Sequence, residues 1–263
     1  MSMKIAKPKQ LEWKDYNKYP DWIAEPKYDG ERVILDVKNS KITIHREETN
    51  IKNANYPEVV ESAKNLPDCI LDGEMCVLNS EYQAQFEKIL NRQATDPTKV
   101  AMLRKTMPAT FMAFDILKYN DTNLESEKFA ERRALLNKIP ESTNIKLVKQ
   151  FKPRELFPLV KQYNMEGIVL KNPNSLYKDA GLKFKNYIES DFKVVGIYSN
   201  KKIISALELE DLNGNYVGRC NWSKYPCTQE WANKVVGMIA VVWHFWTNGG
   251  KVRFPILKEL RKA

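Results

Sequence analysis

The sequence of 263 residues lacks the features that mark a membrane or secreted protein. No apolar run approaches the roughly 20 residues that a membrane-spanning helix needs. The N-terminus holds no apolar core of signal-peptide length. We therefore expect a cytoplasmic protein that acts without a membrane.

Cysteine and histidine are scarce, which limits the metal sites and nucleophilic triads that the chain can build. The four cysteines are Cys69, Cys76, Cys220 and Cys227. Each pair has six residues between its members, where zinc sites commonly have about two to four. We expect reduced, partly buried thiols. Only two histidines, His45 and His244, are present, which argues against a histidine-based triad or metal cage.

Two common phosphate-binding loops are also missing. The chain has neither Gly-x-x-x-x-Gly-Lys-Ser/Thr nor Gly-x-Gly-x-x-Gly. What remains is a set of lysines, arginines and acids near the ends of predicted strands. Such a set suits a site that handles phosphate, where the protein mainly positions groups and neutralises charge.

The net charge of +9 is the first positive indication of function. A basic balance of this size suits a polyanionic partner, with nucleic acid ahead of an anionic membrane. Excess lysine also keeps proteins soluble, so the charge leaves that simpler reading open.

The richest stretch is residues 25–32, Glu-Pro-Lys-Tyr-Asp-Gly-Glu-Arg, which precedes the apolar run Val33-Ile34-Leu35. Gly30 permits a backbone turn, and the apolar run predicts a strand that leaves it. A possible nucleophile, Lys27, therefore lies near the end of a strand. A charged surface turn before an edge strand is the alternative reading of this stretch.

Hydrophobic patterning predicts alternating strands and helices over the first part of the chain. We expect a hairpin of residues 33–37 and 41–46, a strand–turn–strand at 69–78, and strands at 110–117, 165–171 and 181–185. We expect helices at 57–66, 82–92, 125–139 and 153–164, and a loop at 94–108.

The pattern changes after about residue 189, where strand-like runs dominate. They cover residues 192–198, 203–210, 215–220, 236–246 and 251–257. Five short strands in this space predict a small barrel, for which the nucleic-acid-binding OB-fold is the commonest candidate. We therefore expect two domains, residues 1–188 and 189–263.

Six stretches occur in the order seen in the covalent nucleotidyltransferase superfamily. They are Lys27-Tyr28-Asp29-Gly30-Glu31-Arg32, Arg46, Leu71-Asp72-Gly73-Glu74, Phe111–Asp115, Glu166–Lys171 and Lys183-Phe184-Lys185. The chain most resembles the ATP-dependent DNA ligases, in the minimal form found in viruses and bacteria. Near the C-terminus, Arg253-Phe254-Pro255 also resembles the ending of small ligases rather than that of capping enzymes.

The resemblance implies an α+β fold. An ATP-grasp-like nucleotidyltransferase domain of antiparallel sheets with helices would precede a small all-β OB-fold barrel. It also implies ATP and Mg²⁺ or Mn²⁺ as cofactors and nicked double-stranded DNA as the partner. We expect a monomer, which would work in the host cytoplasm if the source is viral.

The resemblance further implies roles for individual residues around ATP. Lys27 would attack the α-phosphate and form a lysine–AMP bond, and Asp29 would act near the metal or the attacking 3′-hydroxyl. The adenine would stack on Phe114 and donate its amine to Glu25, because a carboxylate is an acceptor only. Arg32 and Glu74 would hold the ribose.

The remaining roles concern cations and metal ligands. Glu166 would bind the divalent metal, with Glu74 as a second candidate ligand. Lys183, Lys185 and Arg46 would contact phosphate and lower the pKa of Lys27 by destabilising its charged form. Contacts to nucleic acid are expected from Arg46, Lys201, Lys202, Lys251 and Arg253.

Several alternatives stay open at this point. The same motifs suit an RNA ligase or an mRNA-capping-type guanylyltransferase. A non-catalytic module that binds nicked DNA is a further possibility, although the intact Lys27, Glu74 and Glu166 argue against it.

Overall fold

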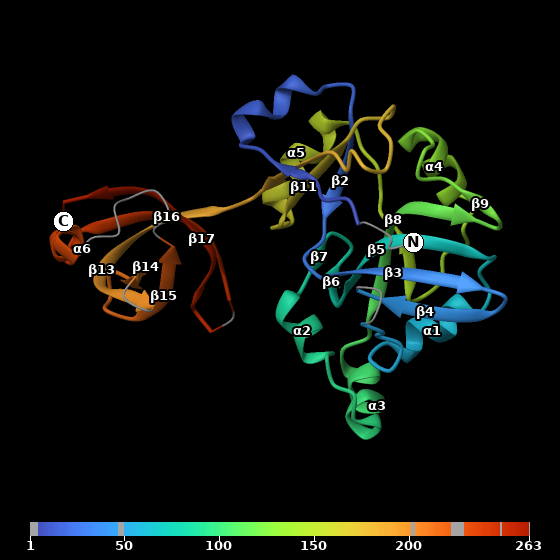
Figure 1. The fold of residues 1–263 in the computed structure, drawn as a ribbon, viewed down its shortest axis with the longest axis horizontal. Helices are drawn as coiled ribbons and strands as arrows, with labels where there is room; N and C mark the ends of the chain where they lie inside the picture. Colours follow the sequence, from blue (N-terminus) through green and yellow to red (C-terminus); the bar gives the residue numbers. More distant parts are fainter. Residues whose placement is uncertain (1–4, 47–49, 201–202, 222–228, 248, 263) are drawn as a thin grey trace. The chain divides into compact units, whose positions relative to one another are not determined.

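A computed structural model describes residues 5–46, 50–200, 203–221, 229–247 and 249–262 of the chain. The chain divides into two compact units, Met1–Asn186 and Tyr187–Ala263. Figure 1 shows the sheets and helices that make up each unit.

The larger sheet of the first unit has six strands in the order β10-β8-β5-β3-β4, with β9 paired to β8. These are β3 (Glu31–Lys38), β4 (Lys41–His45), β5 (Cys69–Cys76), β8 (Thr110–Tyr119), β9 (Thr122–Asn123) and β10 (Ile145–Leu147). Val33, Leu71 and Phe111 are fully buried in the main core of this unit. Each such side chain contributes about 1.5–3 kcal/mol through burial, so this core fixes the strands that reach the site.

A smaller sheet carries the nucleophile candidate. Its strands run in the order β1-β12-β11-β2, with only the β1–β12 pair parallel. They are β1 (Lys9–Gln10), β2 (Ile23–Lys27), β11 (Gly167–Lys171) and β12 (Leu182–Lys185). Helix α5 (Pro153–Gln162) buries Leu156 and Val160 in a second core with Ile168 of this sheet.

Short elements complete the first unit. They are the 3₁₀ helix η1 (Trp13–Lys18), the two-stranded pair β6 (Leu78–Ser80) and β7 (Gln83–Ala84), and helices α1 (Pro57–Ala63), α2 (Phe86–Asn91), α3 (Pro97–Thr106) and α4 (Phe129–Leu136). Val59 and Ala63 of α1, together with Leu136 of α4, pack into the main core. These two helices therefore hold the larger sheet in place.

The predicted turn within residues 69–78 is wrong, because β5 runs unbroken from Cys69 to Cys76. Gly73 serves close packing and not a turn. A Cβ built on Gly73 would lie 2.5 Å from the ring of Phe111 on the next strand. Glu74 is therefore a strand residue.

The predicted loop at 94–108 is also wrong, since helix α3 occupies most of it. The side chain of Asp96 caps this helix by accepting a hydrogen bond of 2.8 Å from the backbone N–H of Lys99. Pro97 occupies its first turn, where a missing N–H costs nothing.

The second unit is a curled antiparallel sheet in the order β15-β14-β13-β16-β17, which confirms the predicted fold class. Its strands are β13 (Ile188–Asn200), β14 (Ile203–Glu210), β15 (Tyr216–Asn221), β16 (Ile239–Trp246) and β17 (Val252–Arg261). The edge strands β15 and β17 approach each other, since a Cβ on Gly218 would lie 3.3 Å from Val252. Helix α6 (Gln229–Val235), which the sequence pattern did not predict, precedes β16.

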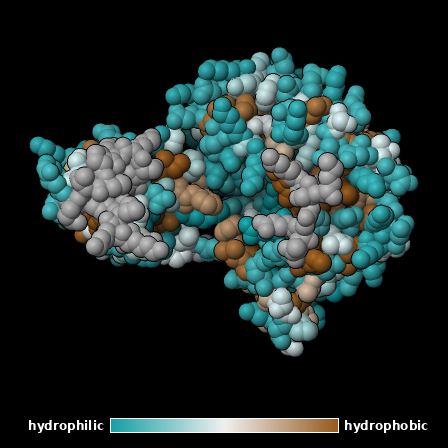
Figure 2. Space-filling view, in the orientation of Figure 1, coloured by the Kyte–Doolittle hydropathy of each residue, from teal (hydrophilic) through white to brown (hydrophobic). Residues whose placement is uncertain are grey.

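Figure 2 shows one face of the molecule, where hydrophilic residues predominate and hydrophobic ones form small separate spots. Over the described residues, every helix is too short or too polar to span a lipid bilayer.

The buried His244 predicts a pH dependence for the second unit. Its ring is fully buried, its Nε2 lies 3.0 Å from Ser190 Oγ, and burial lowers its pKa below 6.5. The unfolded chain then binds a proton more readily than the folded one. This histidine's contribution to stability is full above about pH 6.5 and falls as the pH drops below it.

We therefore expect the melting temperature of this unit, followed by tryptophan fluorescence, to fall between about pH 7 and about pH 5. The His244→Gln variant should lose most of that slope, whereas His45→Gln, in the first unit, should keep it. A slope that survives in His244→Gln would contradict this account.

Candidate active site

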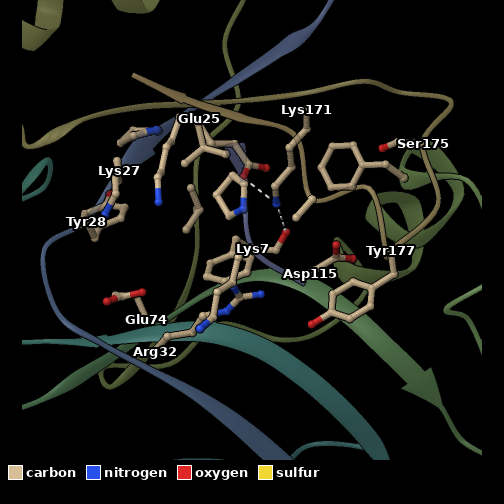
Figure 3. Close-up of a pocket in the computed structure, with 18 of the residues that line it drawn as sticks. Lys7, Glu25, Lys27, Tyr28, Arg32, Glu74, Asp115, Lys171, Ser175 and Tyr177 are labelled. Atoms are coloured by element: carbon tan, nitrogen blue, oxygen red, sulfur yellow. Dashed lines mark hydrogen bonds and ion pairs between the residues drawn. The ribbon is translucent and has the colours of Figure 1, made fainter. Parts of the chain in front are cut away.

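A cavity of about 300 Å³ lies between the two sheets of the first unit. Its lining includes Glu25 and Lys27 from β2, Glu74 from β5, Phe114 from β8 and Lys183 from β12. Figure 3 shows these walls, with Lys27 and Glu25 on one strand and Arg32 on the side across from them. The volume is at the lower end of the range for small-molecule sites.

The nucleophile candidate Lys27 is held by a carboxylate. Its Nζ lies 2.6 Å from Oε2 of Glu166, and Lys185 Nζ lies 3.5 Å from the other oxygen of the same carboxylate. The Glu166 side chain is only 5% exposed, so water screens these pairs little. Three of the predicted site residues therefore meet at one point.

Two glycines make this arrangement possible. Gly30 donates its N–H to Glu74 Oε1 over 3.2 Å, and a Cβ on it would lie 2.2 Å from the carbonyl oxygen of Met75. Gly167 follows Glu166 and has a φ of +156°, and a Cβ on it would lie 2.0 Å from the carbonyl oxygen of Phe184. Any side chain at either position would push the site strands apart.

The charge state of Lys27 differs from the sequence-based prediction. Burial alone lowers its pKa, but the carboxylates of Glu166, Glu74 and Asp29 outweigh burial and raise the pKa above its ordinary value. Lys183 and Lys185 instead have lowered pKa values, mainly because they are desolvated. The prediction of a lowered pKa for Lys27 is thus wrong for the protein alone, because the carboxylates outweigh the repulsion from Lys183 and Lys185.

Glu74 has an unusual environment as well. Burial raises its pKa to about 8, against the opposing effect of Lys27. A carboxylate that resists ionisation in the free protein is poised to gain charge when a cation arrives.

Arg32 is fixed by a buried acid. Its Nε and Nη2 donate to the two oxygens of Asp72 over 3.0 and 2.6 Å, and Tyr177 donates its hydroxyl to the same carboxylate over 2.7 Å. The guanidinium also lies 5.2 Å from the ring centroid of Phe114. Both side chains line the cavity, so this network defines one of its walls.

Glu25 forms the opposite wall, where it is 2% exposed. Its carboxylate lies 2.8 Å from Lys171 Nζ and 3.6 Å from Arg133 Nη1, and it accepts a hydrogen bond of 3.1 Å from Gln150. Lys171 also donates to the backbone oxygen of Phe114 over 2.9 Å. The predicted adenine acceptor is therefore already surrounded by donors.

Other predicted site residues lie elsewhere. Arg46 is 59% exposed and lies 3.8 Å from Glu31, and it does not line the cavity. In the second unit, Lys251 donates to the backbone oxygen of Tyr216, and the guanidinium of Arg253 lies 4.6 Å from the ring of Phe254. Lys201 and Lys202 lie outside the described residues.

Sequence reasoning missed several residues of the cavity. Two buried contacts support its walls. One joins Tyr177 to Asp72, and the other joins Arg132 Nε to Asp115 Oδ1 over 2.8 Å. Asp72 and Asp115 are acids within apolar strands, which is the one signal that could have suggested buried partners. No local pattern pointed to Tyr177.

The profile of the ATP-dependent DNA ligase domain family matches residues 4–187. This range covers most of the chain and the entire cavity. The chain therefore belongs to the ATP-dependent DNA ligase domain family, which confirms the resemblance seen in its motifs.

Individual relatives agree with this assignment. DNA ligase C2 of Mycolicibacterium smegmatis is 36% identical over 126 residues, which are 47% of this chain and 35% of that protein. The SPbeta prophage-derived DNA ligase-like protein LigB of Bacillus subtilis is 26% identical over 200 residues, or 73% of this chain and 70% of that one. The match thus spans about a third of the first relative and most of the second.

A solved structure from work on DNA binding with a minimal scaffold by Lig E DNA ligases has the same fold. The TM-score is 0.74 at 18% identity, over 99% of this chain and 100% of that one.

The ion pair at the cavity generates a prediction about Lys27. Replacing Glu166 by Gln keeps the shape of the side chain and removes its charge, so the pKa of Lys27 should fall. A pH titration of lysine signals by NMR, with Lys27→Arg for assignment, would measure this shift.

Asp179→Asn is the matched control, because Asp179 lines the cavity but is not among the groups that raise the pKa of Lys27. An unchanged pKa of Lys27 in Glu166→Gln would show that another group holds its proton.

Proposed function

We propose that this chain is an ATP-dependent DNA ligase that seals nicks in duplex DNA. The observation that carries the proposal is the placement of Lys27 in a cavity between two sheets, held by the buried Glu166. The family match adds the class of reaction.

The first step uses Lys27 as the nucleophile. Its neutral amine attacks the α-phosphate of ATP, a P–N bond forms, and the P–O bond to pyrophosphate breaks with the electron pair leaving on the pyrophosphate oxygen. Lys27 must first lose a proton, and Glu166 Oε2 is the nearest acceptor at 2.6 Å. Lys183 and Lys185 supply positive charge from β12, on the other side of β11 from β2.

Two further steps move the AMP. The 5′-phosphate at the nick attacks the phosphorus of the lysine–AMP bond and releases Lys27. The 3′-hydroxyl then attacks the adenylylated 5′-phosphate, closes the strand and expels AMP. Asp29, two residues after Lys27, is our candidate for the acid that acts near this hydroxyl.

The residues around Lys27 fit a divalent cation such as Mg²⁺ or Mn²⁺. Mg²⁺ typically takes one or two protein carboxylates and completes its shell with phosphate oxygens and water. Over the described residues no cluster of three acidic, histidine or cysteine side chains occurs, but Glu166 and Glu74 supply the two carboxylates needed. The ion would supply neutralisation of charge on the phosphates.

The remaining lining residues suit the nucleoside. Phe114 offers an aromatic face for adenine, and Glu25 offers a carboxylate. Lys171 connects the two, since its Nζ contacts both the Glu25 carboxylate and the backbone oxygen of Phe114. Arg32 and Glu74 lie on adjacent strands in direct register, which supports our assignment of both to the ribose. We propose that the protein acts as a monomer.

We assign nucleotide transfer to residues 1–188 and part of the grip on DNA to residues 189–263. Arg253 and Lys251 are the described candidates for phosphate contacts in the second region, with Arg46 in the first. Lys201 and Lys202 complete this proposed set.

Two other reactions use the same chemistry, namely RNA ligation and GTP-dependent capping. The family match and the Arg253-Phe254-Pro255 ending favour DNA ligation over both. The choice of substrate is therefore part of the test.

Nick sealing tests the proposal directly. We expect the chain to join a 5′-phosphorylated nick in duplex DNA with ATP and Mg²⁺. The Lys27→Ala variant should seal at least about a thousandfold more slowly, since covalent transfer needs this amine. Glu166→Ala should also lose most activity while keeping the melting temperature of the parent within a few degrees.

Lys9→Ala serves as the control, because Lys9 is exposed and does not line the cavity. Sealing of an RNA nick in preference to DNA, or a requirement for GTP, would reject the proposal.

The grip of the second region on DNA is tested by salt dependence. Replacing Arg253 by Ala should weaken binding to nicked duplex and reduce the slope of log K against log salt by about one. Lys234→Ala is the matched control, since Lys234 is already paired with Glu230 at 2.8 Å. Equal slopes for both variants would remove Arg253 from the set of phosphate contacts.

A further inference from the structure

The cations around the cavity divide into two groups. Four of them are paired with acids over 2.6–2.8 Å: Lys27 with Glu166, Arg32 with Asp72, Arg132 with Asp115, and Lys171 with Glu25. Lys7 and Lys183 also line the cavity, and neither forms an ion pair with any described residue. The exposed Asp179 lies at the same rim but pairs with neither lysine.

The backbone around Lys7 is firmly held although its side chain is exposed. The neighbouring Ala6 is buried beside Ile34, Leu117 and Tyr177, and its carbonyl oxygen accepts a hydrogen bond of 2.5 Å from Arg32. Two residues later, Lys9 donates its N–H to Gly181 over 3.0 Å. The backbone is thus held on both sides of Lys7, which keeps its side chain within reach of the cavity.

Lys7 and Lys27 reach the cavity from different walls. Figure 3 shows Lys27 on the strand that carries Glu25, and Lys7 on the side of Arg32. When Lys27 attacks the α-phosphate, in-line displacement places the leaving oxygen on the side away from its amine. A cation that serves the leaving group must come from another wall, which is where Lys7 lies.

We propose that Lys7 binds the β- and γ-phosphates of ATP and stabilises the pyrophosphate as it leaves. This inference rests on the proposed function, and it assigns a residue to the leaving group, for which the sequence motifs offered none. Lys27 forms the bond to phosphorus, and Lys7 neutralises the charge that develops on the departing oxygen.

Binding of ATP and AMP to the Lys27→Ala protein isolates this contact, because that protein cannot react and AMP lacks the β- and γ-phosphates. In this background, Lys7→Ala should weaken ATP about tenfold or more, as expected for one charge-assisted hydrogen bond. AMP affinity should change by less than about twofold. Lys7→Arg should restore ATP binding, and Lys9→Ala should affect neither nucleotide.

Four results would overturn the inference. ATP affinity that stays at the parental value in Lys7→Ala, or ATP and AMP affinities that weaken equally, would place Lys7 away from the leaving group. Lost affinity for a 5′-phosphorylated nick with unchanged ATP affinity would assign Lys7 to DNA phosphate. A Lys27→Ala parent that binds no nucleotide would instead refute the proposed function, and with it this inference.

Discussion

The register between three strands is the constraint on which the site depends. Gly167 on β11 lies opposite Lys27 on β2 and opposite Lys185 on β12. Glu166 precedes this glycine, so its carboxylate reaches both lysines at the end of the sheet. A slip of one residue in either pairing would turn the side chains of that strand to the other face. The absence of a Cβ at Gly167 allows the close strand contact that fixes this register.

The same contact sets the chemical problem that the protein must solve. Glu166 positions Lys27 but also raises its pKa, while nucleophilic attack needs the neutral amine. The single negative charge of Glu166 cannot fully neutralise both the Lys27 ammonium group and a divalent cation. A divalent metal ion bound by Glu166, as we propose, would weaken the attraction of this carboxylate for the lysine proton. In the proposed mechanism, this pairing holds Lys27 in its charged form in the free protein and must weaken before Lys27 reacts.

Sequence reasoning predicted the elements whose hydrophobic pattern matches the way they are buried in the fold. The apolar run at 110–117 forms most of β8, and the strand that carries Lys183 and Lys185 occurs where its pattern placed it. The strand that carries Lys27, β2, was not predicted. The prediction of a turn was wrong at a glycine that serves close packing. Gly73 suggested a turn, but it allows β5 to pack on Phe111.

The partners of the site residues were harder to predict, because they come from distant parts of the chain. Tyr177 meets Asp72 from 105 positions away, and no local pattern reports such a contact. The prediction for the charge state of Lys27 was wrong for a related reason. The motifs indicated the cations near Lys27. In the folded protein, three carboxylates have the larger effect on its pKa. Sequence thus indicated several of the residues that gather at the cavity, and only the fold revealed the electrostatic balance among them.

The central claim is that Lys27 becomes covalently bound to AMP. Incubation with ATP and Mg²⁺, followed by intact-mass and peptide mass spectrometry, measures this most directly. The account predicts the added mass of one AMP on the peptide that contains Lys27, and its disappearance when pyrophosphate is supplied. An adduct on another lysine, or no adduct in a folded protein that binds ATP, would contradict it.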